Sequence, residues 1–291
     1  MTPGDTFAVI GGSGAHKLLA ALNQNATPIG PVDTPFGESG PLYRIRVRDA
    51  HFLFLPRHGA TGYEIAAPWV NYRANIYALK EQGVDCILSW SGPGAIDNSL
   101  RIGQFVLPTD LIDETCGRES SFYRGTGLGF IRQSPVFCPE VRQAGERALH
   151  LLRLEYRDHG VYVCTQGPRL ETPAEIRHYR KEGAHLVGMT LAPEVFLARE
   201  LEMCYAPICY VTNFAEGVYE RDKRPGELFE GLIGEAEREA AGQALGRFVD
   251  IAAMVARSLP DERNCPCGMT MERFRQEKRI GDDWHTWIGK P

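Results

Sequence analysis

The chain has 291 residues, of which 43% are hydrophobic and 24% charged, a composition typical of globular proteins that excludes collagen, coiled-coil and disordered classes. Lys and Arg number 32 against 37 Asp and Glu, so the formal net charge is -5 and no overall basic excess points to nucleic acid or a membrane surface as a partner. The N-terminus lacks a signal-peptide pattern, and no run of about 18 apolar residues predicts a transmembrane helix, so we expect a cytoplasmic protein.

Apolar strands and amphipathic helices alternate along the whole chain, which predicts an α/β fold in which helices cover a sheet. Strands are predicted at 6–10, 51–56, 86–90, 105–113, 161–166, 186–190 and 205–213. Helices are predicted at 70–83, 172–183 and 192–203, and over a long stretch at 227–259 that Gly231 or Gly234 would interrupt. No linker-like segment divides the chain, so we expect one domain followed by an irregular tail from about Pro260.

The helix at 172–183 has the clearest local signals. Thr172 suits the N-cap, Pro173 the first helical position and Glu175 the third, which together predict a capping box. Gly183 suits the end of the helix.

Several predicted strands end in small or polar residues, and the C-terminal ends of strands build the site in open α/β sheets. These residues are Gly11-Gly12-Ser13-Gly14, Arg57-His58, Ser91-Gly92, Thr190 and Asn213. Glycine lets backbone N–H groups approach an oxyanion, and hydroxyl and guanidinium groups bind phosphate. Each group alone is also typical of a plain turn or a surface pair. Because GGSG is not GxGxxG and no Walker lysine follows it, a dinucleotide or nucleoside triphosphate site is not indicated.

A longer ordered series of motifs runs through the chain. It comprises GGSG (11–14), TPFGESG (34–40), RHG (57–59), SGPGAI (91–96), CTQGPRLETPAEI (164–176), GAHLVGMT (183–190), PEVFLARE (193–200) and YVTN (210–213). This series resembles the trimeric purine nucleoside phosphorylase and methylthioadenosine phosphorylase family, and within it most closely the methylthioinosine phosphorylase branch. The resemblance implies one catalytic domain at 1–259, with a central mixed, twisted sheet or barrel flanked by helices, and a separate tail at 260–291.

The resemblance implies a pentosyltransferase that cleaves a purine nucleoside with inorganic phosphate, giving the free purine and a ribose 1-phosphate without a metal or organic cofactor. The implied catalytic residues are Asn213 and His58. The implied phosphate ligands are Ser13, Arg57, His58, Ser91, Gly92 and Thr190, although Ser13 and Ser91 are alternatively backbone caps. Met189 matches a methionine under the ribose, and Leu170 is expected beside the substrate. Phe130 resembles a residue that a neighbouring subunit inserts beside the sugar, which implies a homotrimer or a dimer of trimers.

Base recognition follows from donor and acceptor matching at two positions. Relatives that act on 6-aminopurines carry Asp at the position of Asn213, whereas relatives that act on 6-oxopurines carry Asn there and Glu at the position of Glu171. An Asn amide donates to O6 and N7 of a 6-oxopurine, and a carboxylate accepts from N1–H. We therefore predict hypoxanthine or guanine, not adenine, as the leaving base. Alternatively, Glu171 supplies charge to the N-terminus of the following helix.

The 5′ end of the substrate is less defined. Where purine nucleoside phosphorylases place a histidine for the 5′-hydroxyl, this chain has Gly231 flanked by apolar residues. Leu228, Phe229, Leu232 and Ile233 suit a 5′-methylthio group, or alternatively the core face of a helix. The expected substrates are thus 5′-methylthioinosine, inosine or guanosine. The alternatives are a methylthioadenosine phosphorylase and a catalytically silent nucleoside-binding protein.

Two departures from the family pattern stand out. The segment after Arg57-His58-Gly59 lacks a second histidine, for which Tyr63 is the suggested substitute. Trp90 precedes the phosphate serine where a smaller residue is expected. The polar loop at 214–226 has the composition of a lid.

The chain has eight cysteines. Those at 86, 116, 138, 164, 204 and 209 are dispersed in apolar surroundings and are predicted to be buried thiols. Cys265 and Cys267 form a Cys-Pro-Cys pair in the polar tail, similar to a pair in some thermophilic methylthioadenosine phosphorylases. A strained disulfide and half of a zinc site, with His285 as third ligand, are both open. We favour free thiols and predict no metal.

Overall fold

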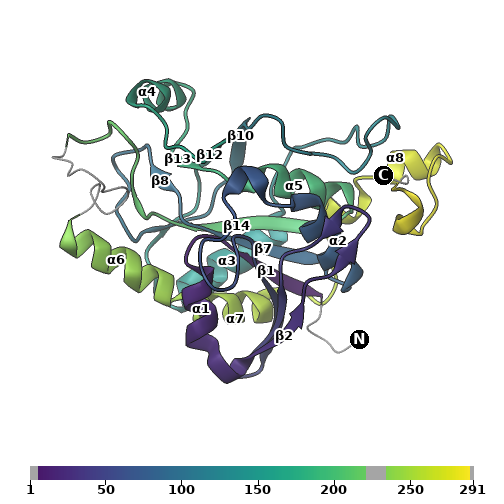
Figure 1. The fold of residues 1–291 in the computed structure, drawn as a ribbon, viewed down its shortest axis with the longest axis horizontal. Coiled ribbons are helices and arrows are strands. Elements are labelled where there is room, and N and C mark those ends of the chain that lie inside the picture. Colours follow the sequence, from purple (N-terminus) through teal and green to yellow (C-terminus); the bar gives the residue numbers. More distant parts are fainter. Residues whose placement is uncertain (1–5, 221–233, 289–291) are drawn as a thin grey trace.

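The computed structural model describes residues 6–220 and 234–288. Its centre is an eight-stranded sheet in the order β11-β9-β14-β7-β1-β6-β5-β2 (Figure 1). Its strands are β1 (Phe7–Gly11), β2 (Ala26–Gly30), β5 (Leu42–Val47), β6 (Ala50–Pro56), β7 (Cys86–Ser91), β9 (Phe105–Val106), β11 (Tyr156–Arg157) and β14 (Cys204–Tyr210).

A second sheet of five strands has the order β10-β12-β13-β8-β15. Its strands are β8 (Gly94–Ala95), β10 (Asp110–Glu114), β12 (Val161–Thr165), β13 (Leu186–Gly188) and β15 (Asn213–Phe214), and a separate ribbon pairs β3 (Asp33–Thr34) with β4 (Gly37–Glu38). Both sheets are mixed, because β13 runs antiparallel to β8 and β14 antiparallel to β9. The predicted α/β fold with a central mixed sheet is therefore confirmed.

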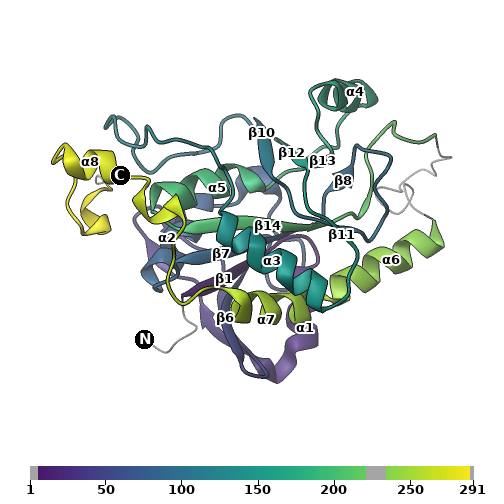
Figure 2. The ribbon, with the colours of Figure 1, turned by 180° about the vertical axis from the view of Figure 1, so that it is seen from behind.

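The central strands β14, β7, β1 and β6 run parallel to one another, and nearly all of their residues are buried. Continuous apolar runs of this kind need helices on both faces. The helices are α1 (Ala15–Leu22), α2 (Tyr72–Glu81), α3 (Pro139–Leu151), α4 (Pro173–Lys181), α5 (Leu191–Glu200), α6 (Glu235–Gly246), α7 (Phe248–Ser258) and α8 (Glu272–Gln276). Helix α3 packs on α7 and β14, and α5 packs on α2 and β14. Figure 2 shows α3 and α7 crossing the back of the larger sheet.

Local signals predicted α4 correctly. The Thr172 hydroxyl accepts a hydrogen bond from the Glu175 N–H at 3.2 Å, and the Glu175 carboxylate accepts one from the Thr172 N–H at 2.7 Å. This is the predicted capping box, with Pro173 in the first turn. Gly183 adopts a φ of 85°, the left-handed conformation expected just after a helix.

Three predicted elements are divided in the structure. The segment 105–113 forms β9 and β10, which belong to different sheets, and 205–213 divides into β14 and β15. The long helical stretch breaks at Arg247, which ends α6 and precedes α7, while Gly234 is the N-cap of α6. Residues 227–233, including Gly231, lie outside the described part of the chain. Apolar periodicity does not mark the two strand divisions, because they depend on partner strands that are distant in the sequence.

The tail is more ordered than predicted. It contains α8 and short 3-10 helices at Pro266–Met269 and Trp284–Thr286. Met271, Phe274 and Trp287 are buried in the same hydrophobic core as the central strands. The expectation of an irregular tail is therefore wrong for residues 260–288, because these apolar side chains find partners on the domain. None of the helices in the described ranges has the length and apolar character that crossing a bilayer requires.

Trp90 packs in an aromatic cluster at the end of β7. Its side chain is only 1% exposed, and its ring lies 5.3 Å from that of Tyr210, 5.1 Å from that of Phe248 and 6.0 Å from that of Phe105. The Trp90 carbonyl accepts hydrogen bonds from the Gly12 N–H and from Arg57 Nη2, both at 3.0 Å. The packing of this large side chain thus fixes the position of the end of β7.

We predict that Trp90→Ala lowers the free energy of unfolding by about 3–5 kcal/mol, because it leaves a cavity among three aromatic rings. Trp90→Phe is the matched control and should cost less than half as much. It keeps a ring and removes an indole N–H that has no partner among the described residues. Urea unfolding measures both values, and an equal cost for the two variants would contradict this packing role.

Candidate functional site

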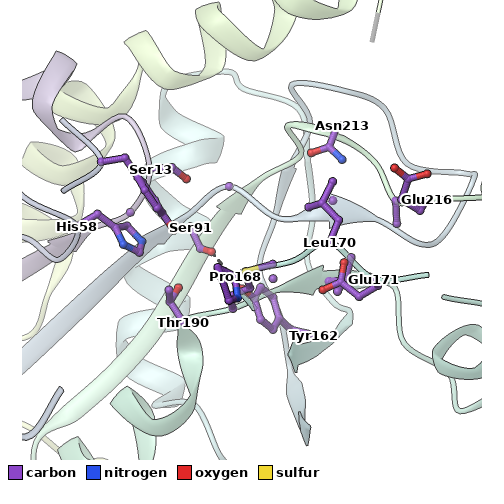
Figure 3. A pocket seen from close by; sticks show the side chains of 18 residues that line it. Ser13, His58, Ser91, Tyr162, Pro168, Leu170, Glu171, Thr190, Asn213 and Glu216 are labelled. Atoms are coloured by element: carbon purple, nitrogen blue, oxygen red, sulfur yellow. Dashed lines mark hydrogen bonds between the residues drawn. The ribbon is translucent and has the colours of Figure 1, made fainter. Parts of the chain in front are cut away.

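A cavity of about 360 Å³ lies where the C-terminal ends of strands from both sheets meet, and its volume suits a small-molecule ligand (Figure 3). It is lined by Gly12, Ser13, His58, Tyr63, Ser91, Gly92, Gly94, Tyr162, Pro168, Leu170, Glu171, Val187, Gly188, Met189, Thr190, Asn213, Ala215 and Glu216. The parallel strands β1, β6 and β7 contribute through the residues at or just after their last positions. The prediction that strand ends build the site agrees with this geometry.

Hydroxyl groups gather at one end of the cavity. Ser13, Ser91 and Thr190 lie there beside His58, as Figure 3 shows. Ser91 Oγ lies 3.4 Å from the Tyr162 hydroxyl. Within residues 6–220 and 234–288, the Ser13 and Thr190 hydroxyls make no hydrogen bond, and the alternative of backbone capping does not describe Ser13 or Ser91. Hydroxyl groups of this kind can donate hydrogen bonds to an oxyanion.

The turn after β1 supports the same end of the cavity. A Cβ at Gly12 would lie 2.9 Å from the Trp90 carbonyl oxygen, so only glycine lets β1 and β7 approach so closely. Ser13 follows directly and precedes α1, whose N-terminal N–H groups and dipole favour a negative charge.

Arg57 does not line the cavity, contrary to its predicted role as a direct phosphate ligand. Its guanidinium is fully buried and pairs with Glu194 at 2.6 Å between Nη1 and Oε1. Nε donates to the Gly11 carbonyl, and Nη2 donates to the Ile10 and Trp90 carbonyls and to Ser89 Oγ. These acceptors hold the guanidinium behind Gly12. A Cβ added at Gly12 would lie 3.8 Å from Arg57 Nη2.

The charge of Arg57 is nevertheless retained. Burial is the largest single influence and lowers the pKa of the guanidinium, but Glu194 together with Tyr205, Tyr72 and Tyr162 outweighs it, so the pKa is raised above its usual value. Glu194 also accepts a hydrogen bond from the Tyr205 hydroxyl at 2.7 Å. A buried ion pair, with Nη2 of its guanidinium nearest Gly12, therefore lies just behind the hydroxyl-rich end of the cavity.

His58 is held as a neutral imidazole. Burial and the nearby charge of Arg57 lower its pKa to about 4. Its Nδ1 lies 2.8 Å from the Ile65 carbonyl oxygen, which only accepts hydrogen bonds, so Nδ1 carries the proton. Nε2 is then an acceptor at neutral pH, and it suits a protonated phosphate oxygen. The Tyr63 ring stacks on His58 at a centroid distance of 4.4 Å and lines the cavity.

Asn213 lies at the opposite end of the cavity, as Figure 3 shows. Its Oδ1 accepts a hydrogen bond from the Thr212 hydroxyl at 2.8 Å, and its Nδ2 donates to the Phe214 carbonyl at 2.9 Å. Because both atoms have a defined partner, the orientation of the amide is set, and one N–H of Nδ2 remains for a ligand.

Glu171 supplies a carboxylate to the same end. It is buried, and its Oε1 accepts a hydrogen bond from the Thr165 hydroxyl at 2.5 Å. Thr172 and Glu175, not Glu171, make the cap of α4. The alternative that Glu171 serves only the helix N-terminus is therefore weaker than a role toward the cavity.

The remaining predicted residues divide into three groups. Met189, Leu170 and Gly92 line the cavity. Phe130 does not, and its side chain is 87% exposed. Leu228 and Leu232, with the rest of the expected 5′ pocket, lie outside the described residues, as does the second half of the 214–226 loop.

Sequence reasoning missed several residues. Glu216 and Tyr162 line the cavity, but a loop position and a buried strand position carry no signal of this role. Arg118 lies in a long loop without a motif. It donates to the carbonyls of Met189, Ala192, Thr165 and Gln166 at 2.6–3.2 Å, so it positions the ends of β12 and β13.

The lowered pKa of His58 predicts a pH-dependent stability. An unfolded histidine has its usual pKa near 6.5, so the unfolded chain binds more protons than the native one between about pH 6.5 and pH 4. The free energy of unfolding therefore falls as the pH falls through this window, by up to about 3 kcal/mol.

His58→Gln removes this contribution. In urea unfolding at a series of pH values, the variant should lose less stability than the parent protein between pH 6.5 and pH 4. Glu200 acts in the opposite sense, because burial raises its pKa to about 7, but it is present in both proteins and cancels in the comparison. Identical slopes for the two proteins would show that His58 is not buried as a neutral group.

Comparison with known proteins agrees with this geometry. Residues 6–253 match the family model of the phosphorylase superfamily. The chain is 38% identical over 271 residues to the 6-oxopurine nucleoside phosphorylase of Pyrococcus furiosus, covering 90% of this chain and 96% of the relative. It is 37% identical over 261 residues to a probable S-methyl-5′-thioinosine phosphorylase of Methanothermobacter thermautotrophicus, covering 90% and 87%.

A solved structure shares the fold. The crystal structure of a methylthioadenosine phosphorylase from an antarctic soil metagenomic library superposes with a TM-score of 0.76 at 29% identity, covering 92% of this chain and 91% of that chain. With its mixed sheets, its cavity at the strand ends and these relatives, the chain belongs to the phosphorylase superfamily.

Proposed function

We propose that this protein cleaves a 6-oxopurine nucleoside with inorganic phosphate, releasing the purine base and a ribose 1-phosphate. The observation that carries the proposal is the pairing of an oriented Asn213 amide with the Glu171 carboxylate at one end of a cavity. The opposite end holds hydroxyl groups and a neutral imidazole in front of a buried guanidinium. A nucleoside and a phosphate thus each have a matching set of groups.

The base end suits hypoxanthine or guanine. The remaining Asn213 N–H is a donor for O6 or N7, and Glu171 is an acceptor for N1–H. Adenine has no proton on N1 and would place a lone pair against the carboxylate. A mismatch between buried polar groups discriminates strongly against the wrong base. The names of the two relatives, a 6-oxopurine nucleoside phosphorylase and a methylthioinosine phosphorylase, support the same assignment.

In the proposed reaction, a phosphate oxygen attacks C1′ of the sugar while the C1′–N9 bond breaks. The electron pair of that bond passes to the purine, and the Asn213 N–H stabilises the charge that develops at O6 and N7. Ser13, Ser91 and Thr190 hold the phosphate, and His58 Nε2 accepts a hydrogen bond from a phosphate hydroxyl. The purine leaves as an anion and takes up its proton from solvent. Arg57 acts through space rather than by contact, because protein acceptors engage its Nε and Nη2 donors and it does not line the cavity.

The sugar would lie between the two ends. Met189 lines the cavity, and we propose that it offers an apolar surface beneath a sugar that becomes cationic. Tyr63 stacks on His58 at the rim, in place of the second histidine of the family pattern. We propose no metal or organic cofactor for the reaction, since phosphate is itself the second substrate.

The oligomeric state of the protein is also a proposal. We propose that Phe130 enters the site of a neighbouring subunit in a homotrimer or dimer of trimers, because this side chain is exposed and outside its own cavity. A protein that is monomeric by analytical ultracentrifugation and fully active in the same buffer would exclude that role.

We propose a cytoplasmic location, because the free thiols suit a reducing compartment. We place the catalytic domain at 1–259, with the tail as an appended segment.

Methylthioadenosine phosphorylase is the alternative activity, because a solved structure of that name shares the fold. The hydroxyl-rich end of the cavity argues against a catalytically silent nucleoside-binding protein, because a site for an attacking phosphate has no use in a protein that only binds nucleosides.

The release of the purine base distinguishes these possibilities. We predict phosphate-dependent release of hypoxanthine from 5′-methylthioinosine or inosine, at a kcat/KM at least about 100-fold above that for adenine from methylthioadenosine. Faster adenine release would contradict the roles of Asn213 and Glu171, and no phosphate-dependent release would favour the binding protein.

Asn213→Asp is the matched variant for this assay. A carboxylate accepts where the amide donates, so the variant should lose activity on 6-oxopurine nucleosides and gain preference for 6-aminopurines. Leu170→Met is the control, since it changes a lining side chain without changing its polarity. An unchanged ratio in Asn213→Asp would remove Asn213 from base recognition.

A further inference from the structure

Four cysteines from three distant segments meet at one point in the fold. The Sγ atoms of Cys138, Cys204, Cys265 and Cys267 all lie within 4.8 Å of one another, and Cys204 Sγ is 3.3 Å from Cys265 Sγ. Cys138 and Cys204 were expected to be separate core thiols, and the tail pair had no assigned partner. Cys116, also expected to be buried, is exposed and lies elsewhere.

The spacing of the sulfurs matches a tetrahedral metal site. A zinc–sulfur bond of about 2.3 Å places the sulfurs of such a site about 3.8 Å apart. Cys138, Cys204 and Cys267 are buried and Cys265 is half-buried, so four ligands close the site without an open position for water. His285, the third ligand considered from sequence, contacts Asp283 and Glu81 instead.

The backbone around the cluster is held independently of any metal. The Cys138 N–H donates to the Tyr205 carbonyl at 2.8 Å, which places Cys138 beside the start of β14. The tail is fixed at Asn264, whose N–H donates to Glu140 Oε1 at 2.8 Å, and at Met271, whose N–H donates to Glu202 Oε1 at 3.0 Å. The sulfurs are therefore brought together by the fold itself.

A cation lies beside the cluster. The Arg263 guanidinium lies 3.8 Å from Cys204 Sγ. Because the thiolate is the form that binds metal, and four thiolates around a divalent ion leave a net negative charge, a neighbouring cation stabilises the filled site.

We propose that Cys138, Cys204, Cys265 and Cys267 bind one Zn²⁺ in the reduced protein. Four soft thiolate ligands in a closed tetrahedron select zinc over oxygen-preferring cations such as Mg²⁺ or Ca²⁺. The site joins the start of α3, the start of β14 and the tail, so its role is to fasten the tail to the domain.

The site is separate from the proposed chemistry. Cys204 is the first residue of β14, and the cavity lies beyond the last residue of this strand, Tyr210, about 20 Å away at about 3.3 Å per residue. Both ribbon views place the tail at the end of the molecule away from β12 and β13 (Figures 1 and 2). Loss of zinc should therefore lower stability with little effect on catalysis.

The first experiment measures the metal content of the full chain purified anaerobically without chelators. Inductively coupled plasma mass spectrometry should find about one zinc per chain, and zinc added to the reduced apoprotein should bind at a ratio of about one and raise the Tm. Co²⁺ in place of zinc should give the visible absorption of a tetrahedral thiolate site. No zinc in the purified protein together with no binding by the reduced apoprotein would overturn the proposal.

The second experiment uses the double variant Cys265→Ser, Cys267→Ser, with Cys116→Ser as the matched control. The double variant should bind no zinc, and added zinc should not raise its Tm. Cys116→Ser should bind zinc and show the same Tm increase as the parent protein. Zinc retained by the double variant would overturn the proposal. So would disulfides among these four cysteines in the anaerobically purified parent protein, detected by alkylation and mass spectrometry. The metal content of the parent protein remains decisive if the double variant does not fold, and neither readout depends on the nucleoside reaction.

Discussion

The buried guanidinium of Arg57 is the interaction on which the arrangement of the site depends. It joins the carbonyls of Ile10 and Gly11 at the end of β1, the end of β7 and the Glu194 carboxylate of α5. Three residues that line the cavity, Gly12, Ser91 and His58, directly follow Gly11, Trp90 and Arg57 itself. Removing one partner of such a buried pair leaves an uncompensated charge and costs about 3–5 kcal/mol, so the strand ends and the site are stabilised by one network.

At this end of the cavity, the groups that can contact a ligand are uncharged, and the charged guanidinium lies behind them. Hydroxyl groups and His58 face the cavity, while the guanidinium lies behind them, held by carbonyls at the strand ends and by Glu194. Groups fixed in advance need no reorganisation during a reaction, and their electrostatic effect is larger where water is excluded. A negatively charged protein can thus offer a favourable place for a dianion, because the local field and not the net charge of -5 decides binding.

Much of the fold could be predicted from the sequence because its signals are local. The capping box at Thr172 and Glu175 needs only neighbouring residues, and the long apolar strands need only their own composition. The direction of the Arg57 side chain could not be predicted, because it depends on Glu194, which is 137 residues away. The meeting of Cys138 and Cys204 with the tail pair is equally non-local. The division of 105–113 between two sheets was missed because it depends on distant partners, β14 and β11 for β9 and β12 for β10.

The central claim is that one cavity brings phosphate to the sugar of a nucleoside. The most direct measurement is ³¹P NMR of the products formed from inosine and phosphate. One ribose 1-phosphate should form for each hypoxanthine released, with no release when phosphate is absent. Free ribose as the sugar product, or base release without phosphate, would contradict the assignment of Ser13, Ser91, Thr190 and His58 to the attacking phosphate.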